Sequence, residues 1–213
     1  EIEFILNTAA EYLERRPTRE DVLSVFTGIR PLVKSSASGN TASLSRDHTI
    51  RIERSGLLTI CGGKWTTYRH MAEDLVNQAA DLAELPEKEC VTRRLNIHGF
   101  FPSHEKLGEL RVYGSDALEI RKMIATEPAL SERLHPALPY TAAEVVWAAR
   151  QEMARTVEDV LARRLRALFL NARAAIAMAP RAAELMAVEL GLDANWQSGQ
   201  LAAFNEIAAK YVV

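Results

Sequence analysis

The segment Thr59–Asp74, TICGGKWTTYRHMAED, carries the strongest structural signal in the chain. The apolar run Leu57–Ile60 enters a Gly62-Gly63 pair, and apolar residues then recur at the three- and four-residue spacing of a helix. A strand that turns into a helix through two glycines lets a ligand approach the backbone closely. The helix start offers free N–H groups and a positive dipole end. The segment predicts a binding turn for an electron-rich ligand or, more simply, a strand–helix corner with a glycine cap.

Length, composition and charge fit a piece of a larger enzyme. The 213 residues allow one large or two small domains. A formal net charge of -2 gives no electrostatic case for nucleic acid, and no apolar run approaches the roughly 20 residues that span a bilayer. Cys61 and Cys90 lack metal-ligand spacing, so we expect reduced cytoplasmic thiols and no metal. Because the chain opens at Glu1 inside a helical pattern, we expect an excised C-terminal fragment.

The sequence predicts an α+β fold, in which a small mixed portion precedes an all-α helical domain. We expect the two units at residues 1–86 and 104–213, joined by a linker at 87–103. The elements expected in the first unit are a helix over about Ile2–Arg15, a strand over Asp21–Leu32, a hairpin of Thr49–Arg54 and Leu57–Cys61, and a helix from Thr66 to near Leu85.

The second unit reads as helical throughout, with apolar residues at bundle spacing. Its expected helices are one that Ser115 caps and that runs to Ala125, Ala142–Ala154 behind a capping box of Thr141 and Glu144, Val157–Leu170 behind Thr156, Asn171–Leu190 broken or kinked at Pro180, and about Asn195–Tyr211.

Three cations of the first unit could form an anion site. Arg30 lies near the end of a predicted strand, after Gly28, Arg46 ends a polar loop and Lys64 stands in the glycine turn. Guanidinium groups bind the oxygens of a phosphate monoester bidentately, so these residues converging on one pocket would bind a phosphate. The alternative is that all three are solvated surface cations, which is the common situation of Arg and Lys.

The glycine turn also carries a family resemblance. The stretch Gly62–Asp74 resembles the C-terminal flavin-contacting segment of FAD-dependent glycerol-3-phosphate dehydrogenases, which pass electrons to quinone. Four further segments resemble that family in order and spacing: Gly28–Leu32, Ser45–His48, Tyr140–Val145 and Arg163–Asn171. Leu165 departs from the pattern, since the family usually has Thr there.

The resemblance implies an activity and a set of roles. The intact enzyme would oxidise sn-glycerol 3-phosphate to dihydroxyacetone phosphate with FAD, at the cytoplasmic face of the membrane or in the cytoplasm. Arg30 and Arg46 would hold the substrate, and Lys64 would lie beside flavin and substrate. The cofactor would contact Gly62, Gly63, Lys64, Trp65, Thr66 and Thr67, although Thr66 and Thr67 could instead only cap the helix.

His48 is a candidate for the base that removes the proton of the alcohol. Histidine is the usual base near neutral pH, and on a strand His48 would share a face with Arg46. It could equally be a structural or exposed residue, with the base in the absent part of the enzyme. Asp47, Glu53 and Glu73 read as solvated acids.

The chain contains no Gly-x-Gly-x-x-Gly. By the resemblance, that dinucleotide-binding motif belongs to an N-terminal FAD domain, and residues 1–86 would complete its flavin and substrate site. We therefore expect the fragment alone to be inactive. An oxidase that uses oxygen and a non-catalytic helical interaction module are the alternatives, and a homodimer is possible.

Overall fold

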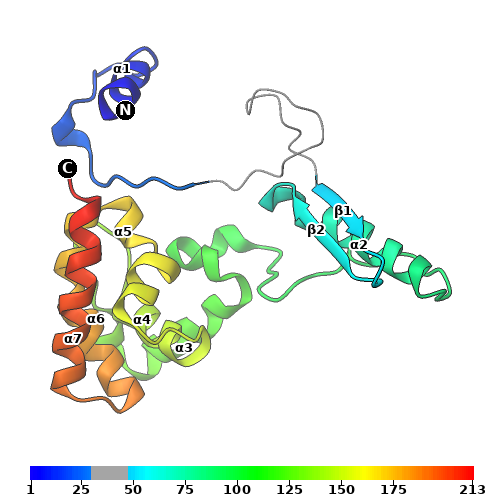
Figure 1. Cartoon of the computed structure of the whole chain (residues 1–213). Helices are drawn as coiled ribbons and strands as arrows, with labels where there is room; N and C mark the ends of the chain where they lie inside the picture. The colour runs from blue at the N-terminus through cyan, green and yellow to red at the C-terminus, as the bar shows by residue number, and fades with distance from the viewer. Residues whose placement is uncertain (30–47) are drawn as a thin grey trace. The chain divides into compact units, whose positions relative to one another are not determined.

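The structure is a computed structural model that describes residues 1–29 and 48–213. Residue contacts divide the chain into two compact units, one formed by Glu1–Thr27 with His98–Val213 and the other by Gly28–Ile97. Figure 1 traces the elements of each. The predicted α+β class is confirmed, since the smaller unit holds a two-stranded sheet and the larger unit is built from helices. The domain boundaries expected near residues 86 and 103, on either side of the predicted linker, stay a prediction.

The sheet of the smaller unit is the predicted hairpin. Strands β1 (His48–Ile52) and β2 (Leu58–Gly62) are antiparallel, with His48 opposite Gly62. The turn between them closes through hydrogen bonds at Glu53, and Gly56 has a φ of 85°. This left-handed conformation favours glycine, and the turn lies between the two strand segments predicted from the sequence.

A helix follows the second strand, as the glycine pair predicts. The chain leaves β2, makes one 3₁₀ turn over Trp65–Thr67 and continues as helix α2 (Tyr68–Leu82). The helix ends earlier than the expected Leu85, because Glu84 adopts a left-handed φ of 52° and the Leu85 N–H donates back to the Ala80 carbonyl. Such a left-handed residue closes the last helical turn.

The N-terminal segment corrects two predictions. Helix α1 spans Ile2–Ala10 and stops short of the expected Arg15. Pro17 disfavours helical geometry in the residue before it, so a helix could not continue far in any case. The expected strand is wrong over the described residues 21–29, because Asp21 ends a 3₁₀ turn and residues 22–29 belong to no strand. Residues 30–32 of that prediction lie outside the described part.

The extended segment is instead bound to the helical unit. The Leu23 carbonyl accepts from the Ala172 N–H at 3.0 Å, and the Val25 N–H donates to the Tyr211 carbonyl at 2.9 Å. The Ser24 hydroxyl donates to the Leu168 carbonyl at 2.7 Å. Because these bonds satisfy backbone groups as a sheet would, residues 22–27 can remain extended without a partner strand.

The larger unit contains the helices that form the main core. These are α3 (Ala117–Thr126), α4 (Ala142–Gln151), the short α5 (Ala167–Leu170), α6 (Ala172–Leu190) and α7 (Ala194–Ala208). In Figure 1, α6 and α7 run side by side. The many alanines of α6 let its neighbours approach closely, which suits a helix buried along most of its length.

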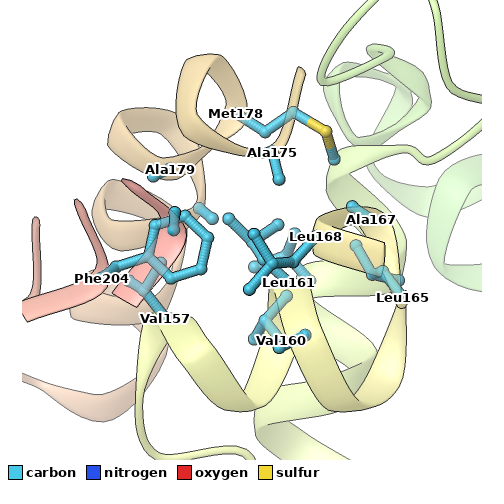
Figure 2. Close-up of a cluster of buried hydrophobic side chains, with 14 of the residues drawn as sticks. Val157, Val160, Leu161, Leu165, Ala167, Leu168, Ala175, Met178, Ala179 and Phe204 are labelled. Atoms are coloured by element: carbon cyan, nitrogen blue, oxygen red, sulfur yellow. The ribbon is translucent and has the colours of Figure 1, made fainter. Parts of the chain in front are cut away.

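Apolar side chains from different helices fill this core. Figure 2 shows Leu161, Leu168 and Met178 converging with Phe204 of α7, and all four are buried. Burying a side chain of this size contributes about 1.5–3 kcal/mol relative to exposure. The larger unit therefore has its own source of stability.

Helix ends in this unit test the predicted capping residues. The Thr141 and Glu144 capping box is present at α4 and confirms the prediction. The prediction for Ser115 is wrong, because Asp116 is the residue that precedes α3 and Ser115 hydrogen-bonds to it. Of the break or kink predicted at Pro180, the break is wrong, since α6 runs through this residue as one helix, and the kink stays a prediction. Buried residues on both sides of Pro180 hold the helix together although one backbone hydrogen bond is missing.

The expected helix Val157–Leu170 is not continuous. Thr156 does accept a hydrogen bond from the Asp159 N–H at 3.0 Å, as a cap should. A wide π-helical turn then covers Asp159–Arg164, and Arg166 takes a left-handed φ of 59° before α5 begins. The left-handed residue changes the chain direction, so one predicted helix becomes two short pieces.

Candidate functional site

The Gly62-Gly63 turn has a backbone that only glycine adopts without strain. Gly62 and Gly63 have φ values of 79° and 75°. A methyl group built on Gly63 would lie 2.5 Å from the Met71 sulfur and 3.4 Å from Cβ of His48. The turn therefore needs both the conformational freedom and the small size of glycine, and it lies directly against β1 and α2.

Lys64 and Thr67 close the helix start through reciprocal hydrogen bonds. The Lys64 N–H donates to the Thr67 hydroxyl at 3.3 Å, and that hydroxyl donates to the Lys64 carbonyl at 3.0 Å. The predicted capping role is thus seen for Thr67, whose hydroxyl is committed to the backbone. Lys64 and Thr66 are exposed.

An aromatic pair borders the turn. The rings of Trp65 and Tyr68 stack with centroids 5.6 Å apart and planes inclined by 29°. Trp65 is 87% exposed, which is unusual for a side chain with so much apolar surface. The turn thus presents a cation, a hydroxyl and an aromatic face on one short segment.

His48 is held by a carboxylate on α2. Its Nε2 donates to Asp74 Oδ2 at 2.7 Å, and the other Asp74 oxygen accepts from Gln78 at 3.2 Å. The hydrogen bond from His48 holds the pKa of Asp74 below its usual value, so this carboxyl is ionised near neutral pH. The His70 ring lies edge-on to His48, with centroids 5.9 Å apart.

Asp74 is the residue of this site that the sequence did not single out. It lies three residues after Met71 and four before Gln78, so all three residues share one face of α2. A carboxylate and an amide on the helix face that meets the hairpin are a sequence pattern that can indicate a polar contact there. The partner of Asp74 is 26 residues away in the sequence, and helical spacing alone gives no means of finding it.

Glu73 corrects a smaller prediction. It is not a solvated acid, because its side chain is only 13% exposed and its carboxylate lies 2.7 Å from the Arg69 guanidinium and 3.5 Å from that of Arg93. The neighbouring Arg69 guanidinium lowers the pKa of this carboxyl. Glu73 therefore ties α2 to the segment that follows it.

The other predicted site residues stand as follows. Arg30 and Arg46 lie outside the described residues, so their convergence with Lys64 stays a prediction. Within residues 1–29 and 48–213, no group of three or more His, Cys, Asp or Glu side chains is placed to hold a metal ion. What the described residues bring together is the glycine turn, Lys64 and the hydrogen-bonded pair of His48 and Asp74.

Comparison with known proteins identifies the family. A family model described as the C-terminal domain of alpha-glycerophosphate oxidase matches residues 57–197, which is more than half of the chain. The chain belongs to this family. The match includes the glycine turn, α2 and the helices up to the start of α7.

The curated proteins to which this member of the glycerophosphate oxidase family is similar are named dehydrogenases. A probable mitochondrial glycerol-3-phosphate dehydrogenase of Caenorhabditis elegans is 39% identical over 94% of this chain and 31% of its own length. The mitochondrial glycerol-3-phosphate dehydrogenase of Homo sapiens is 38% identical over 100% of this chain and 32% of its own length. The chain thus spans about a third of the length of these relatives.

A solved structure shares the fold. The glycerol-3-phosphate dehydrogenase of Bacillus halodurans, determined in complex with FAD, aligns with a TM-score of 0.71 and 24% identity over 99% of this chain and 45% of its own. At this identity the likeness establishes the fold. Within the described part of this family member, none of the helices has the length and apolarity needed to cross a membrane.

Proposed function

We propose that the chain is the C-terminal part of a flavoenzyme that oxidises sn-glycerol 3-phosphate to dihydroxyacetone phosphate with FAD. The observation that carries this proposal is the family membership, together with relatives that are named glycerol-3-phosphate dehydrogenases. The glycine turn supports it independently, because a turn of this geometry at a helix start suits close approach of a ligand.

The residues of the turn fit an electron-rich ring edge. Gly62 and Gly63 adopt the left-handed φ values that favour glycine, and the first turn of the helix contributes N–H groups and a positive dipole end. FAD, when bound, supplies the acceptor for the two electrons that leave the alcohol carbon. Lys64 and the backbone of residues 62–67 would hold its pyrimidine edge, where negative charge gathers, and the fixed ammonium would stabilise that charge.

The substrate would be held by its phosphate. Arg30 and Arg46 are the cations that we assign to this role, with Lys64 beside flavin and substrate. Guanidinium groups suit a phosphate monoester because their paired N–H donors match two oxygens at once. Binding of the phosphate would orient the hydroxyl-bearing carbon toward the cofactor.

Two roles remain open for His48. As a base it would take the proton of the substrate hydroxyl. Its Nε2 is engaged by Asp74, so Nδ1 is the nitrogen that would accept a proton while this bond persists. As a structural residue it would hold the turn against α2.

We further propose that the parent enzyme passes electrons to quinone as a peripheral protein at the cytoplasmic face of a membrane. A separate N-terminal FAD domain would complete the site, and a homodimer is possible. The second candidate is an oxidase that reduces oxygen, which the description of the matching family model favours. A helical interaction module without activity is the third.

One experiment separates these functions. The full-length protein would be purified and its absorbance read near 450 nm, where oxidised flavins absorb. Bleaching of this band by glycerol 3-phosphate under nitrogen supports the dehydrogenase or oxidase. Recovery of the band with a soluble quinone, but not with air, selects the dehydrogenase, and rapid recovery with air selects the oxidase. Absence of flavin absorbance in the purified protein would favour the third candidate, the helical interaction module.

A further inference from the structure

A hydrogen-bonded series of side chains connects α2 to the first residue of the hairpin. Gln78 donates to one oxygen of Asp74 at 3.2 Å, and His48 donates from Nε2 to the other oxygen at 2.7 Å. The His48 side chain is 16% exposed and the Asp74 side chain is 40% exposed, so the bond is shielded from water mainly on the histidine side. A hydrogen bond to an ionised carboxylate is shorter and stronger than one between neutral groups.

His48 also contacts the glycine turn. It pairs with Gly62 in the sheet register, and a methyl group on Gly63 would lie 3.4 Å from its Cβ. The Met71 sulfur would lie 2.5 Å from the same methyl group. A residue of β1 and a residue of α2 therefore fill the space beside Gly63.

Helix α2 thus holds the turn in two ways. Met71 touches it directly, and Asp74, three residues later on the same helix face, reaches it through His48. If the bond between Asp74 and His48 is lost, the Met71 contact has to hold more of the turn, and a thioether side chain adapts its shape easily. The position of the turn relative to α2 then becomes less well defined.

We propose that Asp74 is a positioning residue which, through His48, fixes the Gly62–Lys64 turn on α2 and so sets where Lys64 meets the cofactor. This proposal rests on the proposed function, in which Lys64 lies beside flavin and substrate. The role needs a hydrogen-bond donor at residue 48 and an acceptor at residue 74. It needs no proton transfer by His48.

The proposal separates the two roles of His48. The side-chain nitrogen of glutamine takes nearly the place of Nε2, so His48→Gln keeps the bond to Asp74 but cannot act as a base. His48→Ala loses both functions. Positioning therefore predicts that glutamine largely restores what alanine removes, whereas base catalysis predicts that both variants are equally inactive.

The test uses the full-length protein with Asp74→Ala, His48→Ala, His48→Gln and the double alanine variant. We expect kcat/KM for glycerol 3-phosphate to fall about 10- to 100-fold in both single alanine variants, since displacement of a catalytic group by about 1 Å has effects of this size. The double variant should be no worse than His48→Ala, because the two residues act as one unit. His48→Gln should stay within about threefold of the wild type.

Asp81→Ala is the matched control, because Asp81 is an exposed aspartate on the same helix. A second readout needs no activity: hydrogen exchange of the amides of residues 62–67 should be faster in Asp74→Ala than in the wild type, and unchanged in Asp81→Ala. Unchanged exchange in Asp74→Ala, additive losses in the double variant, or a His48→Gln enzyme as inactive as His48→Ala would each overturn the proposal.

The proposed function and the positioning role of Asp74 can fail separately. A wild type that does not oxidise glycerol 3-phosphate defeats the proposed function, but the exchange comparison still tests the positioning of the turn. If Asp74→Ala does not fold, Asp74→Asn takes its place, because its amide oxygen still accepts from His48. We then expect exchange at residues 62–67 close to that of the wild type in Asp74→Asn and faster in His48→Ala. Equal exchange in these two variants overturns the proposal.

Discussion

Gly63 lies so close to Met71 that a single added methyl group would come within 2.5 Å of the sulfur. Gly63 also has a left-handed φ of 75°. Two independent physical constraints, backbone conformation and space, therefore require glycine at the point where the chain turns toward Lys64.

Replacing this glycine should weaken the turn. Gly63→Ala is expected to lower the local opening free energy of residues 62–71 by about 1–3 kcal/mol, since the alanine is strained and also collides with Met71. Hydrogen exchange of these amides measures the loss. Adding Met71→Ala removes the collision but not the backbone strain, so protection should recover only in part. Full recovery would show that φ is irrelevant at Gly63.

Removing the cation of the turn should change the redox properties of a bound flavin. Lys64→Met in the full-length protein is expected to lower the flavin reduction potential and slow its reduction by glycerol 3-phosphate, because the fixed positive charge no longer offsets developing negative charge. Dye-equilibration titration gives the potential. Lys88→Met, at another exposed lysine of the smaller unit, is the control and should leave it unchanged. Equal potentials in the wild type and Lys64→Met would separate Lys64 from the cofactor.

The two arginines before the hairpin should matter for the substrate. Arg30→Ala or Arg46→Ala is expected to weaken the use of glycerol 3-phosphate by roughly 2–5 kcal/mol in kcat/KM, if the phosphate is bound away from water. Steady-state kinetics of the full-length protein measure this effect. Arg54→Ala, at an exposed arginine in the hairpin turn, should have little effect. Unchanged kcat/KM in both test variants would remove these arginines from the site.

The buried Glu144 makes a prediction about pH and stability. Its carboxylate accepts hydrogen bonds from the Thr141 N–H at 2.8 Å and the Tyr113 hydroxyl at 3.1 Å. Burial raises the pKa of Glu144 above its ordinary value of 4.5, so the folded chain binds this proton more tightly than the unfolded chain. Stability from this group is fully present below pH 4.5 and is lost as the pH rises through the folded-state pKa.

Two variants test this account of Glu144. The stability difference between the wild type and Glu144→Gln should shrink as the pH rises above 4.5, because glutamine does not titrate. Glu144→Ala should cost about 1–3 kcal/mol for the unpaired Tyr113 hydroxyl and about 1 kcal/mol more for the lost cap. Urea denaturation at several pH values measures both effects. A difference that grows with pH would mean that burial does not dominate the pKa of Glu144.

The chain alone should fold without turning over substrate. The motivation is that it lacks the Gly-x-Gly-x-x-Gly motif that would hold the ADP half of FAD. Circular dichroism should show helical structure, and an assay with glycerol 3-phosphate and a redox dye should show no steady reduction. Sustained dye reduction by the pure chain would refute this prediction.

Local signals in the sequence located the hairpin, the glycine turn and the capping box at Thr141. Each of these depends on residues a few positions apart, so its pattern is complete within a short window. The segment at Val22–Phe26 has the apolar pattern of a strand, but its hydrogen-bond partners lie on helices far along the chain, and only tertiary structure provides them.

The residues of the candidate site could likewise be predicted only where the signal is local in the sequence. The sequence indicated Gly62, Gly63, Lys64 and His48, because their types and order are distinctive. It did not indicate that Asp74 binds His48, since that contact requires the hairpin to fold back on α2. The left-handed Arg166 has no sequence signal either, because arginine rarely adopts this conformation without its neighbours imposing it.

The hydrogen bond between Val25 and Tyr211 has a consequence for the order of folding. The smaller unit is an insertion, since the chain leaves the larger unit after Thr27 and returns to it at His98. Ser24 and its partner Leu168 are 144 residues apart in sequence, so the first segment must wait for residues that are synthesised much later. Closing so long a loop is slow, although its length adds little to the free-energy cost. A change that displaces Tyr211 would therefore also affect the structure near the start of the sequence, because the Val25 N–H would lose its acceptor.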